Sequence, residues 1–213
     1  DIGGHCMGVE DSELYTRWVQ FGVFSPIMRL HSTKDQFMDR TPWGHEKDVF
    51  EITRKYMELR HKLIPYIYTM NWQSSQTGVS LIRPMYYFEK CEEAYSVPDQ
   101  YYFGSEMIVA PYLDPIENKT GLSKQIVWLP DGEWFDFFNG EKHEGDSWNI
   151  RYGDLSETNV FVKAGAIIPM GKIGDFGEVD NPEELVINVF PGNNNEFKLY
   201  EDAGEGKEFE NDK

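Results

Sequence analysis

The spacing of apolar residues changes near residue 92, and this change constrains the fold more than any other feature of the sequence. Over residues 46–70, apolar side chains recur every three or four positions, which is typical of an amphipathic helix. Beyond residue 92, short apolar runs alternate with turn sequences such as those at 130–132 and 139–140. The sequence therefore predicts an α/β part followed by an all-β part.

Two helices and one strand are expected in the first part. Asp11 or Ser12 can cap a helix that ends at Gly22. The apolar residues expected on one face of this helix are Leu14, Trp18 and Phe21. The helical pattern over 46–70 is the strongest in the chain, and Pro65 removes a backbone donor inside it, so we expect a kink there.

Residues 26–31 alternate between two faces, as a strand does. Ile27, Arg29 and His31 share one face, and Met28 and Leu30 share the other. The order of strands and helices, with polar side chains at the ends of the strands, is typical of an α/β barrel. In such a barrel the loops after the strands carry the chemistry.

The second part contains the strand-like runs that suggest a β-sandwich. These runs lie at 107–110, 125–129, 134–138, 161–162, 166–168 and 185–190. By their alternation, Trp128, Trp134 and Phe135 are candidates for its core. An exposed sugar-binding platform is the less favoured interpretation of these aromatic residues.

The charge of the chain is unevenly distributed and argues against some partners. The net charge is −17 over 213 residues. Residues 1–92 hold 11 basic and 12 acidic side chains, whereas residues 93–213 hold 9 and 25. An acidic surface repels phosphates, so neither nucleic acid nor an anionic membrane is an expected partner. No apolar run approaches the roughly 20 residues that span a bilayer.

Cysteine and histidine placement predicts no metal and no cofactor. Cys6 and Cys91 are far apart and form no CxxC pair, so we expect buried thiols in a reducing compartment and a cytoplasmic protein. His5 lies beside Cys6, but no further ligands follow at a suitable spacing. The acidic stretch 201–212 lacks the pattern of an EF-hand calcium loop.

Several motifs in the first part resemble glycoside hydrolase family 31, the family of α-glucosidases and α-xylosidases. They are DIGGH at 1–5, ELYTRWVQFGVFSPIMRLHS at 13–32, RTPW at 40–43 and LRHKLIPYIYT at 59–69. The resemblance continues in order along the second part. Its motifs there are RPMYY at 83–87, QYYFGSEMIVAP at 100–111, VWLPDGEWFDFFNGE at 127–141, VKAGAIIPM at 162–170 and FKLYEDAGEG at 197–206.

The resemblance implies a specific domain order. Residues 1–88 would be the C-terminal βα units of a (β/α)8 TIM barrel. Residues 89–180 would form a proximal C-terminal β-sandwich, and residues 181–213 would begin a distal β-domain. The fold class is thus α/β plus all-β.

The resemblance also implies retaining hydrolysis of an α-glycosidic bond by two Asp residues. In the family both precede the DIGG motif, so no catalytic residue is expected here. We therefore expect a fragment that lacks the N-terminal part of its polypeptide and is inactive alone. The expected substrate is an oligosaccharide with a terminal non-reducing α-linked glucose. An α-xylosidase and a non-catalytic carbohydrate-binding or packing module are the alternatives, and a homo-oligomer is left open.

Five residues are candidates for contact with the sugar. His31 matches the family histidine that hydrogen-bonds sugar hydroxyls, and Asp1 matches an aspartate that lines the same site. His5 stands where the family more commonly has Phe, which suggests a different linkage preference. Arg29 could reach substrate, but an ion pair with a barrel carboxylate is favoured. Trp43 could stack on a sugar ring, although packing of its loop against the barrel is favoured.

Overall fold

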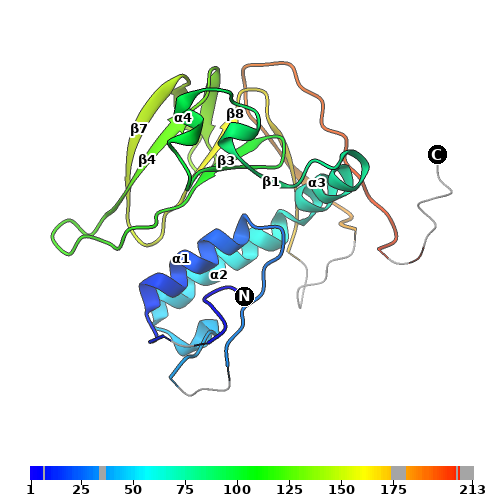
Figure 1. Ribbon diagram of the computed structural model, residues 1–213. Coiled ribbons are helices and arrows are strands. Elements are labelled where there is room, and N and C mark those ends of the chain that lie inside the picture. Colours follow the sequence, from blue (N-terminus) through cyan, green and yellow to red (C-terminus); the bar gives the residue numbers. More distant parts are fainter. Residues whose placement is uncertain (7, 34–36, 174–180, 205, 207–213) are drawn as a thin grey trace.

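The computed structural model describes residues 1–6, 8–33, 37–173, 181–204 and 206. Helices α1 (Ser12–Val23) and α2 (Lys47–Lys62) lie side by side, and α3 (Ile64–Thr77) continues from α2 towards the sheets (Figure 1). The predicted order of an α/β part followed by an all-β part is confirmed. The acidic stretch 201–212, considered above for calcium, lies mostly outside the described residues.

The helix boundaries follow local chemistry. The carboxylate of Asp11 accepts a hydrogen bond from the backbone N–H of Leu14 at 2.8 Å and so caps α1, as predicted. The kink expected near Pro65 is a complete break. Helix α2 ends at Lys62, Leu63 joins the two helices, and Pro65 lies in the first turn of α3, where its missing N–H costs nothing.

The buried face of α1 differs from the prediction. Tyr15, Val19 and Val23 point into the core, whereas Leu14 is 56% exposed and Trp18 is 37% exposed. Both sets of residues repeat at helical spacing, so periodicity alone could not choose between them. The choice is made by the packing of α1 against α2.

The strands form one sheet of six and two antiparallel pairs. The sheet runs in the order β1-β2-β3-β8-β5-β6, and the pairs are β4 with β7 and β9 with β10. Their bounds are β1 Ile82–Pro84, β2 Tyr101–Phe103, β3 Met107–Ala110, β4 Ser123–Leu129, β5 Glu133–Asp136, β6 Lys142–Glu144, β7 Ser147–Gly153, β8 Asn159–Lys163, β9 Ile167–Gly171 and β10 Leu185–Val189. The remaining short helices are η1 (Pro42–Gly44), η2 (Met85–Tyr87) and α4 (Glu92–Tyr95). Each predicted strand-like run overlaps one of these strands, and the three predicted core aromatics are buried.

The run 26–31 does not form the predicted strand, because it begins in a bend and only Leu30 pairs with another segment. Leu30 forms an isolated parallel bridge with Ile2, and α1 is the connection between these two residues along the chain. The predicted alternation holds, because Ile27 is exposed and Leu30 packs against the core. This is a short βαβ arrangement, in which the ends of both extended segments meet at one edge.

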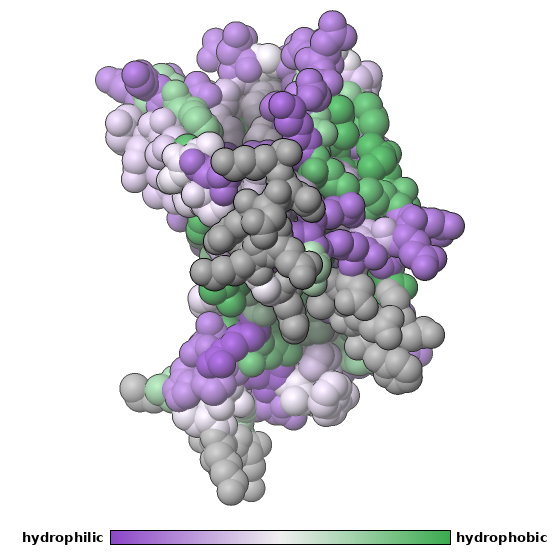
Figure 2. All heavy atoms as spheres, turned by 90° about the vertical axis from the view of Figure 1, so that its right-hand side faces the viewer, coloured by the Kyte–Doolittle hydropathy of each residue, from purple (hydrophilic) through white to green (hydrophobic). Residues whose placement is uncertain are grey.

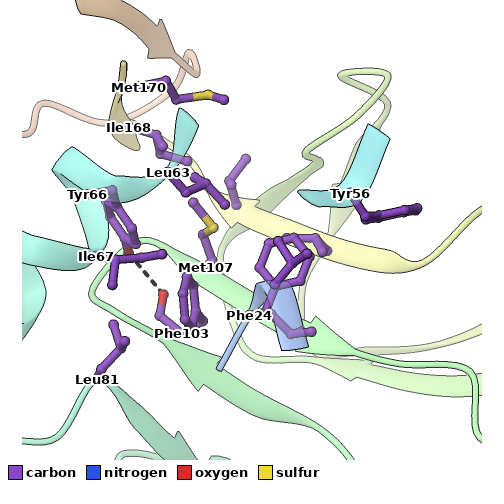
Figure 3. Close-up of a cluster of buried hydrophobic side chains, with 14 of the residues drawn as sticks. Phe24, Tyr56, Leu63, Tyr66, Ile67, Leu81, Phe103, Met107, Ile168 and Met170 are labelled. Carbon is purple, nitrogen blue, oxygen red and sulfur yellow. Dashed lines mark hydrogen bonds between the residues drawn. The ribbon is translucent and has the colours of Figure 1, made fainter. Parts of the chain in front are cut away.

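The main core joins α3 to the sheet. Tyr66 is fully buried, and its hydroxyl donates a hydrogen bond to the carbonyl of Phe103 at 2.9 Å (Figure 3). The same oxygen accepts from the backbone N–H of Glu106 at 3.1 Å. Burial raises the pKa of Tyr66 well above its usual range, so the phenol stays neutral and keeps both bonds. The three domain limits given above remain predictions.

The two cysteines are more exposed than the sequence predicted. Cys6 is exposed and Cys91 is only partly buried, so the expectation of buried thiols is wrong. Cys6 follows the turn at 1–4 and lies at the surface, whereas Cys91 precedes a single-turn helix and packs against the edge of a core cluster without being buried in it. None of the described helices is long and apolar enough to cross a membrane. One face shows hydrophobic residues gathered beside strongly hydrophilic ones (Figure 2).

Candidate functional site

Two short segments, residues 1–5 and 29–33, bring the predicted site residues together. The backbone N–H of Ile2 donates to the carbonyl of Arg29 at 2.9 Å, and that of Thr33 donates to the carbonyl of His5 at 2.8 Å. These two bonds hold the segments side by side over their whole length. We call the four side chains that they align the Asp1–His31 cluster: Asp1, His5, Arg29 and His31.

An ion pair organises the acidic end of the cluster. Arg29 donates through Nε at 2.9 Å and approaches through Nη2 at 2.8 Å, both towards Oδ1 of Asp1. The favoured interpretation of Arg29, an ion pair with a carboxylate, is therefore confirmed. The pair is exposed enough to add little stability, and its main effect is to orient the carboxylate. The second oxygen, Oδ2, faces Nδ1 of His5 at 3.8 Å.

The rings of the two histidines of the cluster lie against each other in a tilted arrangement. The ring centroids of His5 and His31 are 4.3 Å apart, with the rings tilted by 48°. Partial desolvation, together with the nearby charges of Arg29 and His5, lowers the pKa of His31 from its ordinary value of 6.5. His31 is therefore neutral at pH 7, with one nitrogen that donates and one that accepts a hydrogen bond.

Arg40 is a supporting residue to which the sequence analysis gave no role. Its Nε donates to the carbonyl of Gly3 at 2.9 Å, which holds the turn between Asp1 and His5. Gly3 has φ +86°, and a Cβ there would lie 2.7 Å from the side chain of Arg40, so only glycine fits. Arg40 lies in the RTPW motif quoted above, but nothing in the sequence pairs it with Gly3.

Trp43 lies apart from the cluster. It belongs to η1 and its side chain is 76% exposed, so the described residues leave most of the ring uncovered. The favoured packing of this ring against the barrel is not what the structure shows. Its role as a stacking surface for a sugar ring remains a prediction.

The cluster is suited to binding hydroxyl groups and unsuited to acid–base catalysis alone. It offers an oriented carboxylate, a guanidinium and two imidazoles, which together supply donors and acceptors. A retaining glycosidase needs two carboxyl groups about 5 Å apart. The cluster contains one carboxylate, and Arg29 already engages it.

Two family models match the chain in order. Residues 1–70 match the glycosyl hydrolases family 31 TIM-barrel domain, and residues 78–168 match the glycosyl hydrolase family 31 C-terminal domain. The chain belongs to glycoside hydrolase family 31. The resemblance stated from the motifs is thus confirmed. The predicted fold class, the end of a barrel followed by β-structure, is confirmed with it.

Relatives within family 31 differ in the reactions for which they are named. The chain is 34% identical, over its full length, to an α-xylosidase of Saccharolobus solfataricus, of which it covers 29%. It is 28% identical over 99% of its length to α-glucosidase 2 of Bacillus thermoamyloliquefaciens, of which it covers 26%. A family 31 dextranase of Flavobacterium johnsoniae, solved with glucose, matches all of the chain with a TM-score of 0.85 and 34% identity. The match covers 26% of that enzyme. The chain thus spans less than a third of each relative.

Proposed function

We propose that the Asp1–His31 cluster is part of the sugar-binding wall of a family 31 glycosidase that releases terminal non-reducing α-linked glucose from oligosaccharides. The observation that supports this most is that the paired segments 1–5 and 29–33 bring Asp1, Arg29 and the two histidines together. In α/β barrels, the residues that follow the strands at this end carry the chemistry.

Each residue has a distinct role in this proposal. Neutral His31 donates to one sugar hydroxyl and accepts from another, contacts that can strengthen in the transition state. Arg29 fixes the carboxylate of Asp1, whose free Oδ2 accepts from a third hydroxyl. His5 extends the wall beside His31. An uncharged substrate is consistent with residues 1–92, which contain the cluster and have a net charge close to zero.

The reaction in this proposal is double displacement. One Asp attacks the anomeric carbon to form a glycosyl-enzyme, while a second protonates the leaving oxygen and then activates water. In the family both of these residues precede the DIGG motif, so the proposal gives neither role to a residue of this chain, and the cluster itself offers one carboxylate, paired with Arg29. The 213 residues alone are therefore expected to be inactive.

The test is replacement of His31 by Ala in the protein that carries this sequence. Loss of two hydrogen bonds to the sugar, about 1.4–2.8 kcal/mol together, lowers kcat/KM for a p-nitrophenyl α-glucoside by about 10- to 100-fold. His61→Ala, on α2 and outside the cluster, is the matched control and keeps wild-type kinetics. Wild-type kcat/KM in His31→Ala would contradict the site assignment.

Comparison of substrates decides between the alternatives. Higher kcat/KM on the α-xyloside than on the α-glucoside would assign the chain to an α-xylosidase. Binding of glucose without hydrolysis of either substrate would favour a non-catalytic carbohydrate-binding module. The α-glucosidase proposal expects hydrolysis of both with preference for glucose, which has a C6 hydroxymethyl group that xylose lacks.

A further inference from the structure

The cluster brings three metal-ligating side chains to one point. One donor atom from each of Asp1, His5 and His31 lies within 4.8 Å of the others. We propose that these three residues bind a zinc ion, and that the bound ion prevents the sugar from binding at the same residues. The zinc site is inferred from the geometry alone. The competition with sugar rests on the proposed function.

Among the described residues, the three donors have no competing hydrogen-bond partner. No hydrogen bond from that part of the chain engages a ring nitrogen of His5 or His31; Nδ1 of His5 faces Asp1 at 3.8 Å, and Arg29 and His5 are charged neighbours of His31. Arg29 occupies Oδ1 of Asp1 and leaves Oδ2 turned towards His5. Although Arg29 pairs with Oδ1 of Asp1, Oδ2 can still bind the metal as an anionic ligand.

The donor set selects zinc over the hard cations. Zinc binds histidine nitrogen and carboxylate oxygen at about 2.0–2.2 Å, and two histidines with one carboxylate are a known zinc ligand set. Calcium and magnesium prefer all-oxygen sites. Tetrahedral zinc ligands lie about 3.4 Å apart. Because the donor atoms lie within 4.8 Å of one another, they have to approach each other by up to about 1.4 Å, which rotation of these partly exposed side chains allows.

The backbone already places the ligands. The N–H of Gly4 donates to the carbonyl of Asp1 at 3.0 Å and closes the turn that carries Asp1 and His5. Bonds from Ile2 to Arg29 and from Thr33 to His5 tie this turn to the segment that carries His31. Binding thus orders three side chains and no backbone, and water completes the fourth position.

Zinc and sugar then compete for the same atoms. Oδ2 of Asp1 and a nitrogen of His31 contact hydroxyls in the proposed function and zinc in the metal-bound form. Added zinc is therefore expected to raise KM for an α-glucoside and leave kcat unchanged, and EDTA is expected to reverse the effect.

Calorimetric titration with zinc tests the site in the protein that carries this sequence, after removal of metal with EDTA. His5→Ala and His31→Ala are each expected to weaken the tightest zinc binding by at least about tenfold. His61→Ala, which removes a histidine outside the cluster, is the control and is expected to bind as the wild type does. Because His5 is at the surface, His5→Gln provides a second variant that keeps the side chain polar.

Two outcomes separate this inference from the proposed function. Equal zinc affinity in the wild type, His5→Ala, His5→Gln and His31→Ala would overturn the metal site even if the enzyme hydrolyses glucosides normally. Zinc binding that depends on His5 and His31 would support the metal site even in a protein without activity on any glycoside tested.

Discussion

Replacement of Gly104 by Ala is expected to lower the free energy of unfolding by about 3–5 kcal/mol. Gly104 has φ +63°, and a Cβ there would lie 2.1 Å from the hydroxyl of Tyr66 and 2.8 Å from the side chain of Met70. Tyr66 cannot retreat, because it is fully buried and its hydroxyl bonds both Phe103 and Glu106. The substitution therefore adds a clash in the core to the strain of a positive φ.

A substitution at Gly121 distinguishes the clash with Tyr66 from the strain of a positive φ. Gly121 has φ +71°, close to that of Gly104, but a Cβ there would meet no atom within 4 Å. Gly121→Ala is therefore expected to cost about 1–2 kcal/mol, the backbone strain alone. Urea denaturation followed by tryptophan fluorescence measures both losses. Equal losses in the two variants would show that the contact with Tyr66 costs nothing.

Replacement of Arg60 by Ala is expected to lower the free energy of unfolding by about 2–4 kcal/mol. The guanidinium donates to the carbonyls of Val23 at 2.8 Å, Pro26 at 3.0 Å and Ser25. These carbonyls lie at and just beyond the end of α1, where backbone acceptors lack helical partners. Without Arg60, three partly buried carbonyls lose their donor together.

Two variants on α2 serve as controls for this prediction. Arg54 forms an exposed ion pair with Glu51, so Arg54→Ala is expected to cost less than about 1 kcal/mol. Arg60→Lys keeps the charge but replaces the planar fork, and is expected to give an intermediate loss. If Arg60→Ala lowers the free energy of unfolding no more than Arg54→Ala does, the hydrogen bonds of Arg60 to the three carbonyls do not stabilise the end of α1.

The same contact links stability to the candidate site. Ser25 and Pro26 begin the segment that leads from α1 to Arg29 and His31, opposite Asp1. Loosening this run shifts the side chains that the proposal assigns to the sugar. Arg60→Ala is therefore expected to raise KM as well as to reduce stability, whereas Arg54→Ala changes neither.

Local chemistry made much of the fold predictable. The capping carboxylate of Asp11 and an interruption near Pro65 depend on neighbours in the sequence, so both could be foreseen, although a kink was expected where the helix breaks completely. Six of the ten described strands could be located because turn residues separate short apolar runs, whereas β1, β2, β6 and β7 were not predicted. The face that α1 buries could not be predicted. One set of residues at helical spacing begins at Leu14 and another begins at Tyr15, and only the packing of α1 against α2 selects the second set.

The sequence by itself determined the family and the order of α/β and all-β parts, because motifs and periodicity are carried by the chain, and it named the four residues of the Asp1–His31 cluster as candidates. Only the tertiary structure decided what those residues form together. The bridge from Ile2 to Leu30 brings His5 onto His31 across 26 positions and turns one oxygen of Asp1 towards them. Contacts over such a separation depend on how the chain packs, and no spacing rule in the sequence encodes them.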